Sequence, residues 1–374
     1  MRKIKKTGLF IILIMLLALV FCQTALAENT DLDPYKRALE QSGAGDINSI
    51  LPSDVGDTLS GLGADLNNPE GLFNISKTGI ITTLLEIFRN GFFEPFKTTL
   101  VIIGVLLIFA SLGGILEEKQ NGMALFVCFV ASVISAAPIF SIMQSVKEAI
   151  RSLCNFMLSL VPVYGGVLLS SGRVSASSGF AALLLSAAEV ISYLISYLFV
   201  PLSGAVICLC LCGGLSPVPI CIRLAEWIKK SANWAMGIAT TLFLGVLSIQ
   251  NSFLNSSDGL GLKASKVVLG SSIPIMGPAI AETVGAVKSC LNLLSGAVGI
   301  YAVLAIALLA LPIITELFLW RVSMWVCSGV AEIFGMPQME KILKSIDFGL
   351  SVLLSATLFT SLLFIVAIAI TIKG

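Results

Sequence analysis

A series of long apolar segments fills the chain from Thr98 to its end. A helix needs about 20 apolar residues to cross the hydrocarbon core of a bilayer. Every segment except the fourth is close to that length. The segments cover residues 98–116, 123–143, 153–170, 180–215, 234–254, 291–314 and 350–372. Only 12% of the 374 residues are charged, whereas soluble domains carry about 25%. The sequence therefore predicts an all-α, polytopic membrane protein and excludes a soluble one.

The segment 180–215 decides how many spans there are. It is long for one span and short for two, and Pro201 lies near its middle. Basic residues tend to remain on the cytoplasmic side, and two short spans here place eight of them inside and six outside, whereas one span reverses the count. The count favours two spans in this segment. We expect about seven transmembrane helices in total, within a range of six to eight.

The N-terminus has the three parts of a secretory signal peptide. Residues 1–27 contain a basic start, an apolar run and an Ala-Leu-Ala ending at Ala27; an uncleaved first helix is the alternative. Residues 28–97 follow as an acidic extracytoplasmic region, with eleven acidic and four basic residues up to position 95. Within it, residues 80–96 are amphipathic, and we expect them to lie along the outer membrane surface before the first span.

Two segments of the transmembrane domain, residues 98–374, differ from ordinary spans. Residues 255–290 combine apolar residues with Pro and Gly, which indicates a re-entrant or interfacial hairpin. A small-residue face that permits close helix contact lies within it, together with two prolines, and these are our candidates for helix contacts or a pore lining: Gly277, Ala281, Gly285, Pro274 and Pro278. Residues 315–349 carry tryptophans and charges, which predicts an amphipathic connector at the interface.

The residue types needed for common catalytic and metal sites are scarce. The chain has no histidine, the commonest metal ligand and the side chain that titrates nearest neutral pH. Its nine cysteines form no C-x-x-C pair, and no phosphate-binding G-x-x-x-x-G-K-[ST] loop is present. The net charge of +1 gives no reason to expect a nucleic acid as partner. We predict a non-enzymatic protein with no catalytic residue, no cofactor and no metal.

Ionisable side chains within apolar segments are candidates for function. Glu189 lies inside the fourth segment, Glu282 follows the small-residue face, and Glu316 lies just after the sixth segment, where it can pair with Arg321. Each can serve a proton or solute pathway. Each can equally make an ordinary hydrogen bond between helices or lie near the membrane surface.

The order of small and apolar residues in the second half resembles the stage III sporulation protein AE family. The resemblance is carried by residues 271–290, SSIPIMGPAIAETVGAVKSC, by 296–300, GAVGI, and by 336–346, MPQMEKILKSI, before a terminal span. Upstream, 160–164, LVPVY, and 168–172, LLSSG, fit the same family. The resemblance covers nearly the whole chain and is most specific over residues 150–374.

The resemblance implies a subunit of a secretion-like membrane complex of endospore-forming bacteria. That complex links the mother cell to the engulfed forespore, includes a separate ATPase and a forespore-membrane partner, and is needed for late forespore gene expression and forespore integrity. The chain would then lie in the mother-cell-derived outer forespore membrane, with residues 28–97 in the intermembrane space. No catalytic residue follows from the resemblance.

Two rival hypotheses remain. One is an independent secondary transporter for a small solute, in which Glu189 couples transport to protons; the lack of a visible inverted repeat argues against it. The other is a membrane scaffold with no conduction path.

Overall fold

The computed structural model describes residues 35–37, 39–40, 47, 51–73, 77–113, 120–170, 174–215, 220–272 and 277–373. Within these ranges the chain is almost entirely helical and contains no strand, so the all-α prediction is confirmed. The predicted signal peptide, residues 1–27, lies outside the described residues.

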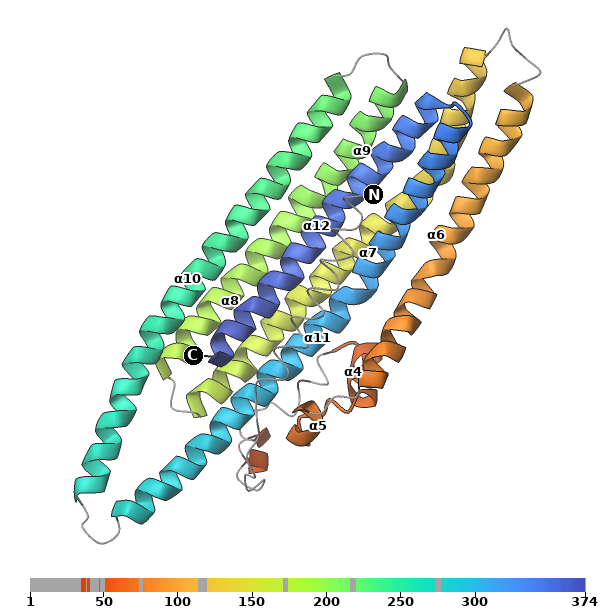
Figure 1. Ribbon diagram of the computed structural model, residues 1–374. Coiled ribbons are helices and arrows are strands. Elements are labelled where there is room, and N and C mark those ends of the chain that lie inside the picture. The colour runs from red at the N-terminus through yellow and green to blue at the C-terminus, as the bar shows by residue number, and fades with distance from the viewer. Residues whose placement is uncertain are drawn as a thin grey trace.

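Six long helical rods lie side by side and alternate in direction (Figure 1). They are α6 (Lys77–Gly113), α7 (Gln120–Ser170), the continuous series α8 (Val174–Leu194), η3 (Ile195–Phe199) and α9 (Val200–Leu215), then α10 (Ile220–Ser272), α11 (Gly277–Ile333) and α12 (Pro337–Lys373). The short helices α4 (Ser53–Gly61) and α5 (Pro69–Phe73) precede them. Among the described residues, six helices are long and apolar enough to cross a membrane, which is the lower end of the predicted range.

Helix α7 joins two segments that the sequence predicted as separate spans. Its 51 residues extend about 77 Å at 1.5 Å per residue, well beyond the hydrocarbon core of about 30 Å. The charged residues between the two segments, Lys147, Glu148 and Arg151, lie on the exposed side of the helix. Ile142, Val146, Ile150, Leu153 and Met157 keep the buried side apolar at helical spacing. The charges therefore mark a face of α7 and not a loop.

The preference for two spans in residues 180–215 is wrong, because α8, η3 and α9 follow one another without a break. Proline has no N–H to donate and disturbs the preceding helical turn. In this helix the turn before Pro201 is π-helical, and the Val200 N–H donates to the Ile195 carbonyl five residues back. The wider turn accommodates Pro201 without ending the helix.

Two predicted interfacial segments belong to long helices. Residues 80–96 form the first half of α6, and not a separate helix before the first span. Of the predicted hairpin 255–290, residues 255–272 continue α10 and residues 277–290 begin α11. The paired ends of α10 and α11 extend past the other helices (Figure 1).

The predicted connector 315–349 consists of the end of α11, a tight turn and the start of α12. Gly335 has a φ of +66°, a conformation that L side chains avoid. The Gly335 N–H donates to the Glu332 carbonyl at 3.1 Å and the Met336 N–H to the Ala331 carbonyl at 3.0 Å. This is a Schellman C-cap, and Pro337 begins the next helix where its missing N–H has no effect.

The centre of the molecule is the antiparallel pair α11 and α12. In the most apolar 18 residues of each of these helices, 67% and 72% of the residues are buried, compared with 11% in α10. Alanines such as Ala302, Ala305, Ala356 and Ala367 are fully buried in this pair. Small side chains let helix backbones approach closely, which is how helices associate within membranes.

A small N-terminal unit containing α4 and α5 packs against α11. Tyr35, Leu59 and Leu72 are fully buried in it, and the Tyr35 hydroxyl donates to the Leu66 carbonyl at 2.7 Å. Burial raises the pKa of Tyr35 well above its usual range, so this hydroxyl remains a neutral donor. Gly71 is required by close packing, because a Cβ there would lie 2.6 Å from the Gly63 carbonyl oxygen.

Candidate functional site

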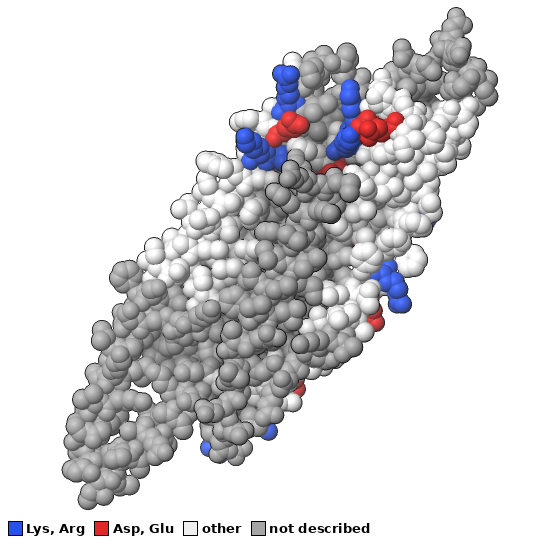
Figure 2. Space-filling view, viewed as in Figure 1, with Lys and Arg blue, Asp and Glu red and all other residues white. Residues whose placement is uncertain are grey.

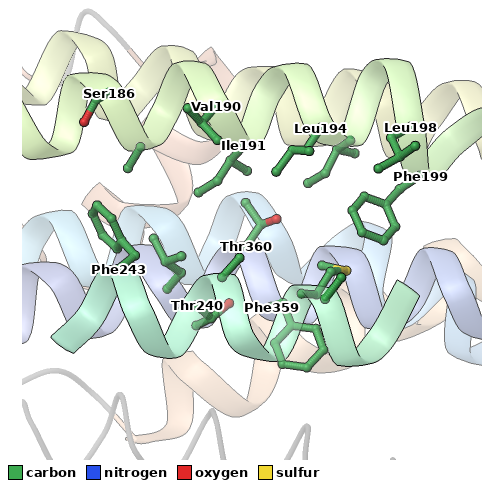
Figure 3. Close-up of a pocket in the computed structure, with 16 residues that line it drawn as sticks. Ser186, Val190, Ile191, Leu194, Leu198, Phe199, Thr240, Phe243, Phe359 and Thr360 are labelled. Carbon is green, nitrogen blue, oxygen red and sulfur yellow. The ribbon is translucent and has the colours of Figure 1, made fainter. Parts of the chain in front are cut away.

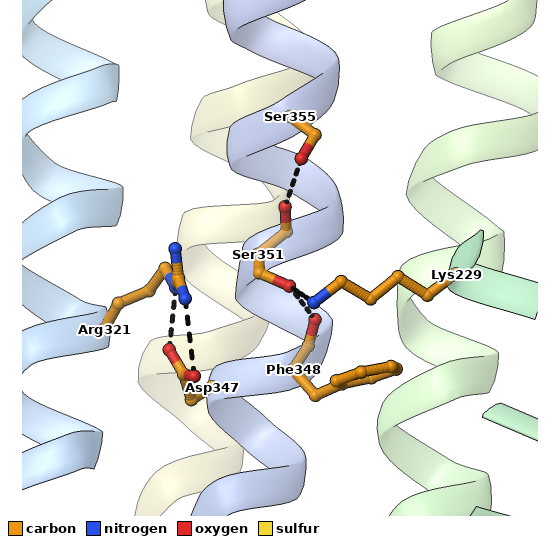
Figure 4. A network of polar contacts seen from close by, with 6 residues as sticks. All are labelled: Lys229, Arg321, Asp347, Phe348, Ser351 and Ser355. Carbon is orange, nitrogen blue, oxygen red and sulfur yellow. Dashed lines mark hydrogen bonds and ion pairs between the residues drawn. The ribbon is translucent and has the colours of Figure 1, made fainter. Parts of the chain in front are cut away.

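Charged side chains gather at the end of the bundle where α10 begins and α11 turns into α12 (Figure 2). The central contact is an ion pair between α11 and α12, in which Arg321 Nε donates to Asp347 Oδ1 at 2.7 Å (Figure 4). A second contact joins Arg321 Nη2 to Asp347 Oδ2 at 3.4 Å. The side chains are only 13% and 31% exposed, so the two charges meet in a partly desolvated place.

Lys229 of α10 approaches α12 at the same level. Its ammonium donates to the Ser351 hydroxyl and lies 3.9 Å from the centre of the Phe348 ring (Figure 4). The Ser351 hydroxyl in turn donates to the Phe348 carbonyl at 2.6 Å, and Ser355 donates to the Ser351 carbonyl at 2.9 Å. A cation above an aromatic ring is stabilised most where water is excluded.

A hydroxyl of α6 meets a hydroxyl of α11 at this level. The hydroxyls of Thr99 and Ser323 are hydrogen-bonded to each other, and both also reach the Pro95 carbonyl, at 2.7 and 3.3 Å. Both side chains are buried. A buried hydroxyl is stable only when it has a partner, so this contact fixes how α6 lies against α11.

Helix α9 meets α12 at this level through Gly349. A Cβ on Gly349 would overlap the Ile207 side chain and lie 3.4 Å from the Ser203 carbonyl. We call the contacts of α6, α9, α10, α11 and α12 around Thr99, Ile207, Lys229, Arg321 and Asp347 the polar layer.

All four tryptophans of the chain lie near the polar layer in sequence: Trp227 and Trp234 in α10, and Trp320 and Trp325 in α11. Trp together with Lys and Arg is typical of the boundary between bilayer and water. The polar layer therefore indicates a membrane boundary for α10, α11 and α12. The apolar parts of these helices, beyond Trp234 in α10 and beyond Ser355 in α12, then lie within the hydrocarbon core.

A lateral groove opens between α8–η3, α10 and α12 on the apolar side of the polar layer (Figure 3). It has a volume of about 250 Å³. The lining is apolar apart from the hydroxyls of Ser186, Thr240 and Thr360. Val190, Leu194 and Leu198 line it from one side, and Phe243 and Phe359 from the other.

The predicted polar residues do not converge on one site. Glu189 is exposed on α8 and is not part of the groove lining. Glu316 is half-buried on α11 and accepts a hydrogen bond from the Trp320 side chain. The pairing with Arg321 that the sequence allows is not the one the structure has, because Arg321 points to Asp347 on the next helix.

The predicted small-residue face lies at the start of α11. For Gly277, Pro278, Ala281, Glu282 and Gly285 the structure gives a helical backbone, and their side-chain surroundings lie outside what it describes. Pro274 lies outside the described residues. The proposed contacts of this face therefore stay predictions.

Sequence reasoning missed Lys229, Asp347 and Ser351. Arg321 and Asp347 are 26 residues apart, and Lys229 and Ser351 are 122 residues apart, so no local spacing connects them. The available signal was the density of Trp and basic residues in 223–234 and 320–344, which marks a membrane boundary but does not identify the partners.

The described residues contain no cluster of three or more His, Cys, Asp or Glu side chains that could hold a metal ion. The antiparallel helices and their six apolar spans instead define a multi-pass helical membrane protein. No solved structure matches the chain.

Comparison with known sequences gives the family. The model of the family "Stage III sporulation protein AE" matches residues 65–374. A relative from Bacillus subtilis (strain 168), itself called stage III sporulation protein AE, is 25% identical over 296 residues, which are 77% of this chain and 72% of the relative. The chain belongs to the stage III sporulation protein AE family, and membership implies a role in sporulation.

Proposed function

We propose that the protein is a non-enzymatic membrane subunit of the secretion-like channel that links the mother cell to the forespore. In this function it is needed for late forespore gene expression and for forespore integrity. The observation that carries the proposal is the family match, which extends over residues 65–374 and so includes all six candidate spans.

The distribution of charge supports a defined orientation. With the residues before Lys77 in the intermembrane space, α6 enters the membrane from that side, and the rise of about 33 Å from Lys77 to Thr99 carries Thr99 across to the polar layer. The expected boundary at residue 97 does not fit this orientation, because the Pro95 carbonyl accepts hydrogen bonds from Thr99 and Ser323 within the polar layer. The polar layer then faces the mother-cell cytoplasm. Residues 220–230 and 321–347 contain six Lys or Arg and four Asp or Glu, and a basic excess is typical of the cytoplasmic side.

In this orientation the polar layer would face the separate ATPase subunit that the family resemblance implies. The helices are longer than a bilayer is thick, so parts of them remain available for contacts with other subunits. The acidic residues of the region that precedes Lys77 would meet forespore-membrane partners, for which complementary charge speeds encounter.

The test is an in-frame deletion in the spore-forming host, scored with a late forespore-specific transcriptional reporter. We expect engulfment to finish and the reporter to stay silent, with recovery when the intact gene is restored. Normal reporter activity and normal spores would overturn the proposal.

The assignment of the small-residue face needs its own experiment. Gly277→Leu or Ala281→Leu should prevent co-purification of other complex subunits, although the protein still inserts into the membrane. Gly296→Ala is the control on the same helix, because a Cβ there meets nothing within 4 Å. Normal co-purification with both variants would remove the contact assignment.

The transporter hypothesis gains no support from the groove, whose lining among the described residues includes no charged side chain. It makes a separate prediction: the purified protein in liposomes would take up solute with protons, and Glu189→Gln would abolish uptake. A channel subunit alone should show no such uptake.

A further inference from the structure

The groove between α8–η3, α10 and α12 lies at the depth of lipid chains. Its lining belongs to the candidate spans Leu184–Leu209, Arg223–Ile249 and Pro337–Ile370. Along α8 and η3 it extends from Ser186 to Phe199, a rise of about 20 Å. One leaflet of a hydrocarbon core of about 30 Å is about 15 Å deep, so the groove is longer than one leaflet is deep and can follow much of an acyl chain.

The groove exists because of local helix geometry. The π-helical turn before Pro201 places Ile195, Leu198 and Phe199 together on the groove wall. On the opposite wall, α10 presents Ala235 and Ala239, whose small side chains leave the space between the helices open. Such π-helical turns occur often at functional sites.

The surroundings of the groove are apolar and face outwards. Val190 is 57% exposed, Leu198 49% and Leu242, on the outer side of α10, 64%. Exposed apolar side chains at this depth contact either lipid or another apolar helix. The groove therefore opens sideways into the membrane.

The size of the groove favours a lipid chain over a helix lodged inside it, since a partner helix could only insert side chains there. One turn of an α-helix is about 10 Å wide and 5.4 Å long, or roughly 420 Å³, more than the whole groove of about 250 Å³. An extended hydrocarbon chain is far narrower. A methylene group is close in volume to a water molecule, about 30 Å³, so the groove has room for about eight methylenes.

One end of the groove approaches the polar layer. Asn233 lies between Lys229 and Met236 on the same side of α10, and its Oδ1 atom is buried with no hydrogen-bond partner. A buried amide oxygen is stable only when a donor reaches it. A lipid whose polar end lies towards Asn233 would place donors or ordered water there.

We propose that this groove binds one acyl chain of a membrane lipid, with the polar end of the lipid towards Asn233 and the methyl end towards Phe243 and Leu363. The site is independent of the sporulation function proposed above, since it follows from the groove alone.

The test uses the full-length protein in nanodiscs that contain a phospholipid with a photoreactive diazirine on one acyl chain. After irradiation, peptide mass spectrometry locates the label. A diazirine near the end of the chain should label peptides around Phe243 and Leu363, and one near the carboxyl group should label those around Leu198 and Ala235. Equal labelling of the lining and of other lipid-facing peptides would overturn the proposal.

A groove-filling variant gives the second readout. Ala239→Phe adds a ring to an exposed lining residue, and we expect labelling of the lining to fall about tenfold, equivalent to about 1.4 kcal/mol of lost binding. Ala205→Phe, at an exposed alanine of α9 outside the groove, should leave labelling unchanged. If Ala239→Phe does not fold, Ala235→Phe replaces it. Unchanged labelling in a folded groove variant would contradict the proposal.

A partner helix remains to be distinguished from lipid. A photoreactive amino acid at Val190, in membranes of the sporulating host, should form lipid adducts. Protein adducts as the main product would overturn the proposal in favour of a subunit interface.

Discussion

The pair α11–α12 and the helix α10 all contain an apolar span, but they bury it to different extents. Most apolar side chains of α11 and α12 are buried within the protein, whereas Trp234, Leu242 and Ile249 of α10 are all more than 60% exposed. In a membrane, apolar composition alone does not separate these cases, because lipid chains are as apolar as leucine. What separates them is the closeness of helix contact, which fully buried alanines such as Ala305 and Ala356 permit in α11 and α12 and which Gly349 permits between α12 and α9. The first pair is the structural core, and α10 is a peripheral helix that faces its surroundings.

The comparison predicts its largest effect for glycine substitutions. Gly349→Ala places a Cβ against Ile207 where no space exists, and overpacking of this kind costs about 3 kcal/mol. We expect the melting temperature in detergent, measured by size-exclusion chromatography after heating, to fall on the order of 10 °C. Gly245→Ala in α10 is the matched control, since its Cβ would meet nothing within 4 Å. Equal melting temperatures for the two variants would remove the distinction between core and periphery.

The ion pair of the polar layer predicts the next largest effect. Asp347→Ala leaves the Arg321 charge, only 13% exposed, without its carboxylate, and we expect a loss of about 2 kcal/mol, between exposed and fully buried pairs. The double variant Arg321→Met with Asp347→Ala should recover most of that loss, because no unpaired charge remains. Glu340→Ala, at the more exposed pair Glu340–Lys344, should change stability by less than about 1 kcal/mol. A double variant no more stable than Asp347→Ala would contradict the role of the pair.

The turn between α11 and α12 predicts a smaller effect. Gly335→Ala forces an L side chain into the left-handed region, at about 1–2 kcal/mol. The measurement is the melting temperature, compared with Gly329→Ala within α11, where a Cβ has space and helix propensity favours alanine. Should both variants melt at the same temperature, the C-cap would not hold the α11–α12 pair together.

The sequence allowed a correct prediction of the all-α membrane fold, because apolar segments of suitable length dominate the chain. The boundaries between the spans were harder to predict from the sequence. Lys147 and Arg151 were taken to mark a loop, but they lie on an exposed face of α7, and Pro201 was taken to mark a break, but a π-helical turn accommodates it. A one-dimensional pattern of charge does not tell whether a charge ends a helix or lies on its outer side.

The candidate site was harder to predict for a related reason. Arg321 was recognised as a charged residue at the end of an apolar segment, and the partner considered for it was Glu316, five residues away and not at ideal helical spacing. The actual partner, Asp347, is reached only after the Gly335 turn reverses the chain. Pairings across such turns depend on the register between helices, which small residues such as Gly349 set through close packing.

The smallest effect should come from the link between the two regions. Lys229→Met removes the contacts of the ammonium with Ser351 and Phe348 but keeps an apolar stem that can pack in the same place. We expect the free energy of unfolding to fall by about 0.5–1 kcal/mol, which is less than for any variant above except the controls.

The more informative measurement is hydrogen–deuterium exchange. Amides in residues 220–235 should exchange faster, while those of α11 and α12 do not change, because a peripheral helix can loosen without opening the core. Lys230→Met, at an exposed neighbour, should leave exchange unchanged. Faster exchange throughout α11 and α12 in the Lys229 variant would mean that α10 is part of the core, and the comparison between the two regions would fail.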